Sequence, residues 1–338
     1  MHYLITGHTG FKGSWLSLML VKQGHTISGI SLDPLEKSLF KQANLSSIFR
    51  HDFRVNICDR TNIRAAVEKV DPDVIVHLAA QPLVKESYKF PVETFQVNVL
   101  GTLNVLEATK DLKNLKAVLI ITTDKVYKNH NHLIGYVEND ELGGADPYSA
   151  SKAAADIASQ SWIKNFAQVP MAIARAGNVI GGGDWASDRI VPDLVDAFST
   201  GRKVKLRYPD AIRPWQHVLD CLNGYLALID AQLSTGTTGE WNFGPDLTHK
   251  FSVGDLASAF ARNWDESLGI GWENDEFEHP HEAGYLLLNS GKARRGLDWK
   301  DKLDFEDSVK WTANWYKNRE NRSIRLLTEL QVDRFAEL

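Results

Sequence analysis

Tyr148 and Lys152 are the residues of this sequence whose types and spacing best suit them to moving a proton. They stand four positions apart near the start of a predicted helix, so their side chains lie on one helix face. An ammonium group there stabilises the phenolate, which lowers the pKa of the tyrosine and suits it to general-base catalysis. Such a pair arises readily by chance, so its meaning depends on the motifs that precede it.

Thr123 is a candidate partner of Tyr148, because it closes an apolar segment that ends in Thr122-Thr123-Asp124-Lys125. A threonine hydroxyl at that place can share the proton of a substrate hydroxyl with the tyrosine. The same residue type commonly caps a turn at the end of a strand, and for Thr123 taken by itself this second interpretation is preferred.

Three glycines near the start of the chain indicate a site for a dinucleotide. Gly7, Gly10 and Gly13 follow a strand-like run and open a helix-like run. Glycines at this spacing permit a tight turn, and the backbone N–H groups of a helix N-terminus bind a pyrophosphate. The expected site includes the turn residues Thr9, Phe11 and Lys12. A glycine-rich turn without a ligand is the alternative, which the strand-to-helix context disfavours.

Asp33 lies twenty residues after Gly13, at the end of the second strand-like run. A carboxylate at this place accepts hydrogen bonds from an adenosine ribose and repels a 2'-phosphate, so it predicts NAD in preference to NADP. Because Pro34 follows directly, the alternative is an aspartate that only forms a turn.

The elements that must position these residues alternate between strands and helices. Short apolar runs predict buried strands at Tyr3–Ile5, Thr26–Ile30, Val74–His77, Ala117–Ile121 and Met171–Ala174. Helical patterns lie between them, at Gly13–Gln23, Thr61–Val70, Pro91–Thr109 and Pro147–Phe166, the last with Asp146 as its N-cap. This order predicts an α/β fold, a Rossmann-type doubly wound parallel sheet with ligands at the carboxyl ends of its strands.

The regular alternation stops near residue 176, which predicts two domains and a tail. Residues 1–176 are expected to form the NAD-binding domain, and residues 177–320 mainly a smaller mixed α/β C-terminal substrate domain. A strand near residues 241–244 is expected to return to the main sheet. Residues 321–338 are expected to be a C-terminal tail, either a helix packed on a neighbour or a solvated end.

Composition argues against several classes of protein. With 38 basic and 43 acidic residues the net charge is -5, so no basic field attracts a nucleic acid. The apolar run Trp15–Val21 has only seven residues, too few to cross a membrane, and the opening segment resembles a strand rather than a signal peptide. A cytoplasmic location is therefore expected. Cys58 and Cys221 lie 163 positions apart and predict neither a disulfide framework nor a metal site.

Beyond these motifs, the sequence resembles the extended short-chain dehydrogenase/reductases, and more narrowly the CDP-glucose branch of the nucleotide-sugar 4,6-dehydratases. The related dTDP-glucose and GDP-mannose dehydratases carry Glu at the position of Lys125, which favours the CDP-glucose branch. The resemblance runs through most of the chain, in TGHTGFKGSWLSL from Thr6, HLAAQPLV from His77, TTDKVY from Thr122, DPYSASKAAAD from Asp146, RAGNVIGGGDWASDRIVPD from Arg175, RPWQHVLD from Arg213, WNFGP from Trp241 and HEAGYLLLNSGKAR from His281.

The resemblance implies a lyase that acts on CDP-D-glucose with NAD as its cofactor. Tyr148, helped by Lys152 and Thr123, would remove the proton of the sugar 4-hydroxyl while C4 hydride passes to NAD+. Asp124 would then protonate the 6-hydroxyl as water leaves across C5 and C6, which requires a raised pKa. Lys125 would either take the C5 proton or only orient the substrate. Return of hydride to C6 gives a 4-keto-6-deoxy sugar without net redox change.

The resemblance also implies further binding residues. For the cofactor, beside the glycine turn, Asp33, Tyr148 and Lys152, these are Asn56, Ile57, Leu78, Ala79, Ala80 and Asn98, where Asn56 replaces a frequent Asp of the family. For the substrate they are Asn178, Trp185, Arg189, Arg213 and Tyr285. The arginines suit bidentate binding of a diphosphate, with solvated ion pairs as the alternative. For the two aromatic residues the alternative is packing in the core.

Other functions remain open at this point. A nucleotide-sugar 4-epimerase would use the same turn and the same Tyr148–Lys152 pair without needing Asp124 beside Lys125, and a dehydratase could act on another nucleotide sugar. A dinucleotide sensor without turnover is a further alternative. In this superfamily, the helices Pro91–Thr109 and Pro147–Phe166 commonly pair with their twofold copies, which implies a homodimer.

Overall fold

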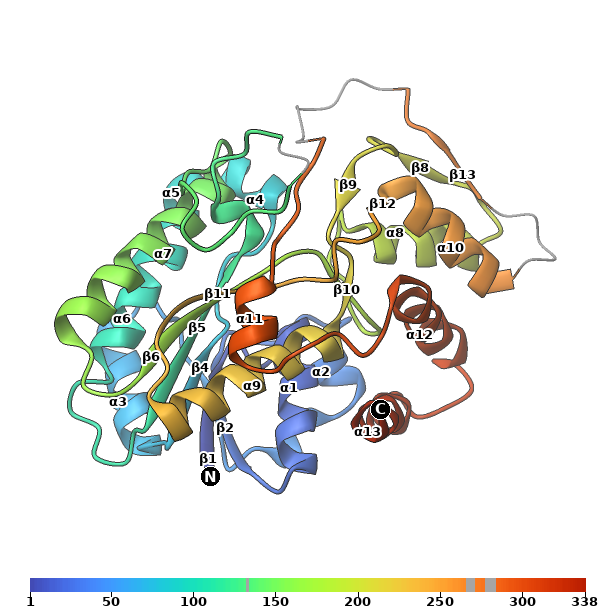
Figure 1. Ribbon diagram of the computed structural model, residues 1–338. Coiled ribbons are helices and arrows are strands. Elements are labelled where there is room, and N and C mark those ends of the chain that lie inside the picture. Colours follow the sequence, from blue (N-terminus) through green and yellow to red (C-terminus); the bar gives the residue numbers. More distant parts are fainter. Residues whose placement is uncertain (132–133, 266–270, 277–283) are drawn as a thin grey trace.

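A seven-stranded sheet forms the centre of the computed structural model, which describes residues 1–131, 134–265, 271–276 and 284–338. His281, where the last family-like segment begins, therefore lies outside the described residues. All neighbouring strands of this sheet are parallel, in the order β11-β6-β5-β4-β1-β2-β3 (Figure 1). The strands are β1 (His2–Thr6), β2 (Thr26–Ser31), β3 (His51–Arg54), β4 (Val74–His77), β5 (Ala117–Thr123), β6 (Met171–Ala176) and β11 (Gly239–Phe243). The predicted Rossmann-type α/β fold is confirmed.

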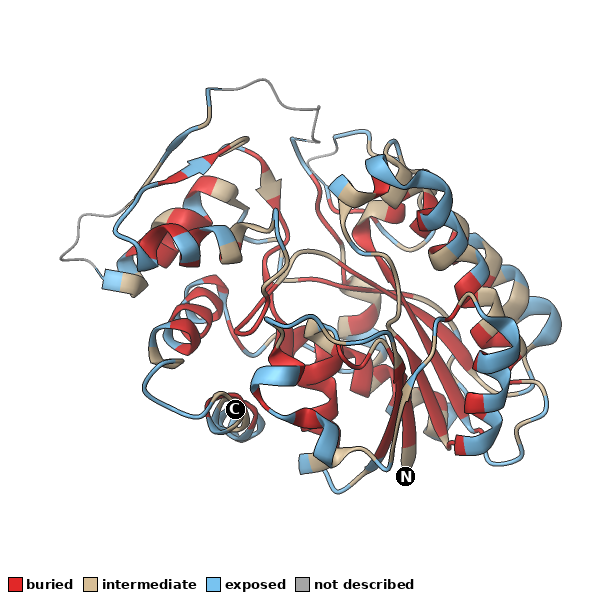
Figure 2. Cartoon of the chain, turned by 180° about the vertical axis from the view of Figure 1, so that it is seen from behind, coloured by how far each residue is buried: buried red, intermediate tan, exposed pale blue. Residues whose placement is uncertain are grey.

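Helices cover both faces of the sheet, which is why its strands are nearly continuous apolar runs. Neighbouring residues of β1 point to opposite faces, so Tyr3 and Ile5 belong to one core and Leu4 to the other. The first core contains residues of α1 (Phe11–Lys22) and α9 (Val218–Thr235). The second is covered by α3 (Arg60–Val70), α6 (Thr102–Glu107) and α7 (Pro147–Phe166). Figure 2 shows the strands buried between these helical layers.

The helix α7 has the bounds that the sequence predicts. The side chain of Asp146 accepts a hydrogen bond from the backbone N–H of Ser149 at 2.9 Å, which satisfies one free donor of the first turn. The helix predicted over Pro91–Thr109 is instead divided into α5 (Pro91–Phe95), a π-helical segment (Gln96–Gly101) and α6. β3 and α4 (Val84–Lys89) do not stand out in the sequence, because both are short and largely polar.

After β6 the chain forms shorter elements, several of which gather beyond the carboxyl ends of the strands (Figure 1). The paired strands there are β7 with β10, β9 with β12, and β8 with β13. β11 returns to the sheet beside β6. The remaining elements are α2 (Leu39–Gln42), a 3-10 turn (Leu45–Ile48), β7 (Val179–Ile180), α8 (Ile190–Ser199), β8 (Val204–Leu206), β9 (Ile212–Arg213), β10 (Gln216–His217), β12 (Phe251–Ser252), α10 (Val253–Asp265), β13 (Trp272–Asn274), α11 (Gly291–Gly296) and α12 (Phe305–Asn318).

The last helix, α13 (Ile324–Glu337), packs on the chain itself, against α1, α2 and α12. Leu327, Val332 and Phe335 are buried in the first core. An ion pair between Lys22 and Asp333, 2.7 Å between Nζ and Oδ2, ties the helix to the end of α1. The C-terminal segment is therefore a packed helix rather than a solvated end.

Candidate active site

The residues expected to move protons meet at the carboxyl end of β5. Thr123 is the last residue of that strand, and Asp124 and Lys125 begin a 3-10 turn (Asp124–Val126). The first two turns of α7 bring Tyr148 and Lys152 to the same place, where Lys152 Nζ donates a hydrogen bond to the carbonyl of Ile121 at 2.9 Å. The carboxyl ends of parallel strands are where ligands bind in such sheets.

Burial dominates the electrostatics of the Tyr148–Lys152 pair. It raises the pKa of Tyr148 to about 12, against a hydrogen bond with Thr123 and the charge of Arg189, which lower it. Burial also lowers the pKa of Lys152 to about 8, although the charge of Asp156 acts in the opposite direction. In the protein alone, desolvation of the phenol outweighs the hydrogen bond and the charge that favour its ionised form, and one donor of the Lys152 ammonium is used by the carbonyl of Ile121.

Asp124 is a buried carboxyl group with unused hydrogen-bonding capacity. Only 1% of it is exposed, and burial raises its pKa, opposed by the charges of Lys125 and Arg213 and by a hydrogen bond from Thr123. The hydroxyl of Thr123 donates to Oδ1 at 3.0 Å, whereas Oδ2 has no partner among the described residues. A carboxyl group held in this way favours its protonated form and can give up a proton. Lys125 beside it is partly exposed.

The glycines of the turn after β1 let protein segments pack closely against one another. Gly7 has a φ of +74°, and a Cβ atom there would lie 2.8 Å from the backbone nitrogen of Ala79. A Cβ on Gly13 would collide with the carbonyl of Gly7, and Gly10 is the N-cap of α1, a helix of 12 residues. These observations fit a dinucleotide whose pyrophosphate lies on the helix N-terminus, because only glycine allows the turn and the helix to approach each other so closely.

The turn is held in place by a chain of hydrogen bonds to the end of β4. Thr6 Oγ1 lies 2.7 Å from His77 Nδ1 and accepts a bond from the backbone N–H of Ala79 at 3.2 Å. Burial lowers the pKa of His77 to about 3, so its ring is neutral. Thr9 Oγ1 lies 2.6 Å from Ser31 Oγ, at the end of β2. The partly buried Leu78, Ala79 and Ala80 therefore stand directly beside the turn.

The residues expected to meet the adenosine end lie around the ends of β2 and β3. The side chain of Asp33 is 91% exposed, and its Oδ1 lies 3.5 Å from Nε of Arg54. Asn56 is exposed and accepts a bond from the backbone N–H of Cys58 at 2.9 Å, whereas Ile57 is buried. The exposed carboxylate of Asp33 can still accept a hydrogen bond from a ribose.

Asn98 has a different surrounding from the other expected cofactor residues. It is fully buried, its Oδ1 accepts from the backbone N–H of Gln81 at 2.8 Å, and its Nδ2 donates to Ser151 Oγ at 2.8 Å. Both ends of the amide are therefore used inside the protein. Asn98 therefore holds the loop after β4 against α7.

Four of the expected substrate residues differ in their burial and their neighbours. Arg213 is 6% exposed and close enough to Asp124 to act on its charge, and Arg189 lies close to Tyr148 while its Nη1 donates to Asp184 at 2.8 Å. Tyr285 is 37% exposed and bridges to Ile212, next to Arg213. Asn178 is partly buried just after β6.

Trp185 does not join this group. Its Nε1 donates to Gln42 at 3.0 Å, and its ring packs on Tyr316 with 5.1 Å between centroids and under Lys37 Nζ at 4.1 Å. In the protein alone the indole therefore packs between α2 and α12, while part of it stays exposed.

Sequence reasoning missed a buried ion pair beneath Lys152. Asp156, one turn further along α7, accepts from Arg175 of β6 through Nη2 at 2.7 Å and Nε at 2.9 Å, and both side chains are almost fully buried. The available signal was the spacing of Lys152 and Asp156, four residues apart on one helix face. Ser87 of α4 was also missed; its Oγ accepts from the backbone N–H of Tyr148 at 3.1 Å.

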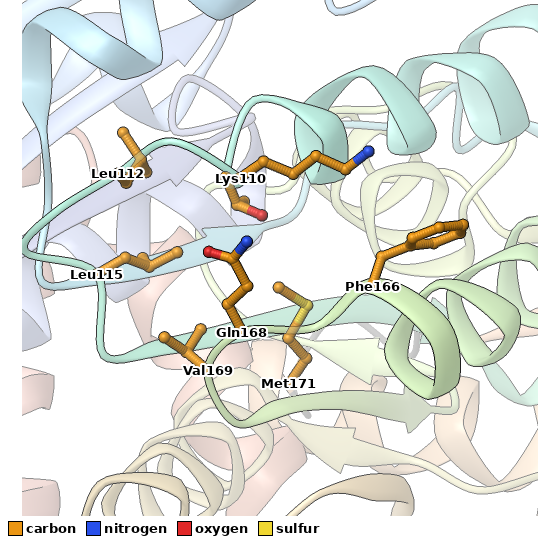
Figure 3. A pocket seen from close by; sticks show the side chains of 8 residues that line it. Lys110, Leu112, Leu115, Phe166, Gln168, Val169 and Met171 are labelled. Carbon is orange, nitrogen blue, oxygen red and sulfur yellow. The ribbon is translucent and has the colours of Figure 1, made fainter.

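A small pocket at the amino ends of β5 and β6 is separate from this site (Figure 3). It lies where β5 and β6 begin, between Leu115, Met171 and the end of α7 at Phe166. Among the described residues, no cluster of three or more His, Cys, Asp or Glu could hold a metal ion. No helix among the residues that the structure describes has the length and apolar character needed to span a membrane.

Comparisons with known proteins agree with this arrangement. Solved structures that share the fold include a dTDP-glucose 4,6-dehydratase from Bacillus anthracis in complex with NAD, with a TM-score of 0.79 at 22% identity over 95% of this chain and 98% of that one. A UDP-glucose 4-epimerase from Stenotrophomonas maltophila has a TM-score of 0.82 at 20% identity over 95% and 99%. At these identities the likeness shows the fold alone.

Sequence relatives are more specific. A CDP-glucose 4,6-dehydratase from Salmonella typhimurium is 39% identical over 93% of this chain and 89% of its own length. A dTDP-glucose 4,6-dehydratase from the same organism is 26% identical over 94% and 92%. The sequence model of the GDP-mannose 4,6 dehydratase family matches residues 4–312. This chain therefore belongs to the GDP-mannose 4,6 dehydratase family, within the extended short-chain dehydrogenase/reductases.

Proposed function

We propose that this protein is an NAD-dependent lyase that converts CDP-D-glucose to CDP-4-dehydro-6-deoxy-D-glucose and water. The observation that carries the proposal is Asp124, a buried carboxyl group with a raised pKa and an unpartnered oxygen, beside Thr123 and the Tyr148–Lys152 pair. Oxidation at C4 needs a base and a hydride acceptor, whereas loss of the 6-hydroxyl also needs an acid. The 39% identity to a CDP-glucose 4,6-dehydratase supports the choice of substrate.

Each protein group has a task in this reaction. Bound NAD+ supplies the hydride acceptor for C4 and the hydride donor for C6. Tyr148 takes the proton of the 4-hydroxyl, and because burial holds its pKa near 12, it depends on nearby cations such as Arg189 to ionise. Thr123 forms a hydrogen bond beside Tyr148 and orients the 4-hydroxyl of the sugar. Asp124 gives its proton to the departing 6-hydroxyl. Lys125 receives the C5 proton or orients the sugar, and a proton must return to C5 when hydride is added at C6.

The residues proposed to bind ligands divide between the cofactor and the substrate. Gly7, Gly10 and Gly13 would hold the pyrophosphate of NAD on the N-terminus of α1, and Asp33 the adenosine ribose. Arg213, with a planar guanidinium close to Asp124, is suited to the diphosphate of the substrate. An epimerase would need no acid at the position of Asp124.

A panel of nucleotide sugars tests the proposal directly. The purified protein is incubated with CDP-, dTDP-, UDP- and GDP-glucose and with GDP-mannose, and 4-keto product is measured by its absorbance in alkali. CDP-glucose is expected to give the fastest formation of product. Preference for another nucleotide would correct the substrate, and a galactose-configured product without loss of water would replace the dehydratase by an epimerase.

We also infer that the protein is a homodimer in the cytoplasm. Several large apolar side chains are exposed along α4, α5, the π-helical segment and α7, namely Tyr88, Phe90, Val92, Phe95, Leu100 and Ile157. An exposed stripe of this kind on adjacent helices suits pairing with a twofold copy. The proposed cofactor and substrate are phosphorylated nucleotides, which do not cross membranes unaided. A monomeric mass by light scattering at micromolar concentration would contradict the dimer.

A further inference from the structure

Gln216 is a buried polar residue to which neither the motifs nor the reaction above gives a task. Only 3% of it is exposed, and neither its Nε2 nor its Oε1 has a hydrogen-bond partner in the described part of the chain. A primary amide in this state is unfavourable in the free protein, because its donor and acceptor lose water without compensation. Such a group is well suited to meet a ligand.

The side chains around Gln216 alternate between the protein core and the opposite side. Trp215 is buried in the first core and donates through Nε1 to the carbonyl of Phe251 at 3.2 Å. His217 lies between the rings of Trp15 and Trp311, at centroid distances of 6.3 and 5.9 Å. Because successive side chains of an extended segment point in opposite directions, the side chain of Gln216 points away from those of Trp215 and His217.

The segment that carries Gln216 lies between the two halves of the active site. Two residues earlier, Pro214 lies against Gly177, where an added Cβ would also lie 3.1 Å from Asp124 Oδ2. Two residues later, Val218 lies against Gly181, where an added Cβ would also lie 3.2 Å from Phe11 Cζ in the glycine turn.

The backbone fixes Gln216 between these two contacts. Its N–H donates to the carbonyl of Asn178 at 3.0 Å, and β10 pairs with β7 in parallel. The segment therefore runs alongside residues 177–181, from the proton donor Asp124 at one end to the cofactor turn at the other.

We propose that Gln216 recognises the carboxamide of the nicotinamide ring through a pair of hydrogen bonds, an inference that rests on the proposed NAD cofactor. The ring that carries the hydride must lie between the glycine turn and the proton-transfer residues, which is the interval that Gln216 spans. A carboxamide presents one donor and one acceptor side by side, so it can satisfy Nε2 and Oε1 together. A single sugar hydroxyl is less complementary to the two groups at once.

Binding measurements on the full chain, freed of any copurified dinucleotide, test this assignment without turnover. Titration calorimetry compares NAD+, the 3-acetylpyridine analogue of NAD+, whose methyl group replaces the carboxamide NH2, and ADP-ribose, which lacks the ring. The protein is expected to prefer NAD+ over the analogue by roughly tenfold. Gln216→Met should weaken NAD+ binding by roughly tenfold, abolish that preference and leave ADP-ribose binding unchanged.

Gln232→Met is a matched control. This amide is also buried with an unpartnered Oε1. Its Nε2, however, donates to the carbonyls of Val118 and Pro170, near the amino ends of β5 and β6 and far from the carboxyl ends where the site lies. The control should leave binding of all three ligands unchanged. The melting temperature of unliganded Gln216→Met should equal or exceed that of the parent, because an uncompensated amide is removed.

Three outcomes would overturn the assignment. An equal affinity of the parent protein for NAD+ and the acetylpyridine analogue would do so whether or not the variant folds. An unchanged preference in Gln216→Met would do so as well. Weaker binding of CDP-glucose with unchanged NAD+ binding would move Gln216 to the sugar. Failure of the parent protein to convert CDP-glucose would refute the proposed reaction and leave these dinucleotide measurements valid.

Discussion

Asp124 and Asp156 are both buried carboxyl groups beside the end of β5, but the protein surrounds them differently. They are 1% and 0% exposed. Asp156 accepts hydrogen bonds from Arg175, from Thr122 at 2.9 Å and from Gln160 at 2.8 Å. Asp124 accepts from Thr123 alone, and its second oxygen has no partner among the described residues. Thr122 and Thr123 are consecutive in an extended strand, so they serve the two carboxyl groups on its opposite sides.

The difference separates a structural carboxylate from a chemical one. A buried charge is tolerated when a cation and hydrogen bonds saturate it, and Asp156 meets both conditions and fastens α7 to β5 and β6. Asp124 meets neither condition fully, so burial raises its pKa and keeps a proton available. The same residue type on one strand end thus holds the site together on one side and is proposed to react on the other.

The largest expected effect is on stability. Asp156→Asn leaves the buried guanidinium of Arg175 without its counter-charge, so the free energy of unfolding should fall by about 3–5 kcal/mol. Asp124→Asn replaces a carboxyl group that burial already disfavours in its charged form, so stability at pH 7 should stay the same or rise. Urea unfolding followed by circular dichroism measures both. Equal losses in the two variants would contradict the distinction.

The next effect concerns catalysis, and here Asp124 is compared with Tyr148. Tyr148→Phe removes the base for oxidation at C4, so activity should fall on the order of 10²-fold or more, and no NADH absorbance should form with CDP-glucose. Asp124→Asn should still oxidise C4 and accumulate NADH, while 6-deoxy product forms slowly. Stopped-flow absorbance separates the two. If Asp124→Asn blocks NADH formation as fully as Tyr148→Phe, the proposed division of labour is wrong.

The extent to which this site could be predicted follows from the range of the interactions. The glycine turn, α7 and its cap at Asp146 depend on neighbours within a few residues, and the fold class follows from the same local patterns. The Asp156–Arg175 pair joins residues from a helix and a strand, and nothing local tells Asp156 from Asp124. The packing of Trp185 was not predictable for the same reason, because its partner Gln42 lies 143 residues away in sequence. The pKa of Tyr148 depends on burial, which spacing does not reveal.

The pH dependence of catalysis tests the role of Lys152, whose pKa burial lowers to about 8. Its ammonium form exists below that pKa, so kcat/KM should decline above about pH 8, approaching tenfold per pH unit. Lys152→Arg keeps a positive charge throughout this range, so the residual activity of that variant should show no decline near pH 8. A decline at the same pH in Lys152→Arg would assign the titration to another group.

The smallest effect concerns a third carboxylate, Asp33. Unlike Asp124 and Asp156, which are buried, Asp33 is exposed. Its Oδ1 lies 3.5 Å from Nε of Arg54, and its charge is expected to repel a 2'-phosphate. Asp33→Ser removes that repulsion and leaves Arg54 able to meet the phosphate, so the preference for NAD+ over NADP+ should shrink by roughly tenfold. The control Glu36→Ser makes the same charge change at another exposed acid, one paired with Lys41, and should leave the ratio of the two dissociation constants unchanged. Equal shifts in both variants, measured by calorimetry, would attribute the effect to net charge rather than to a contact with the ribose.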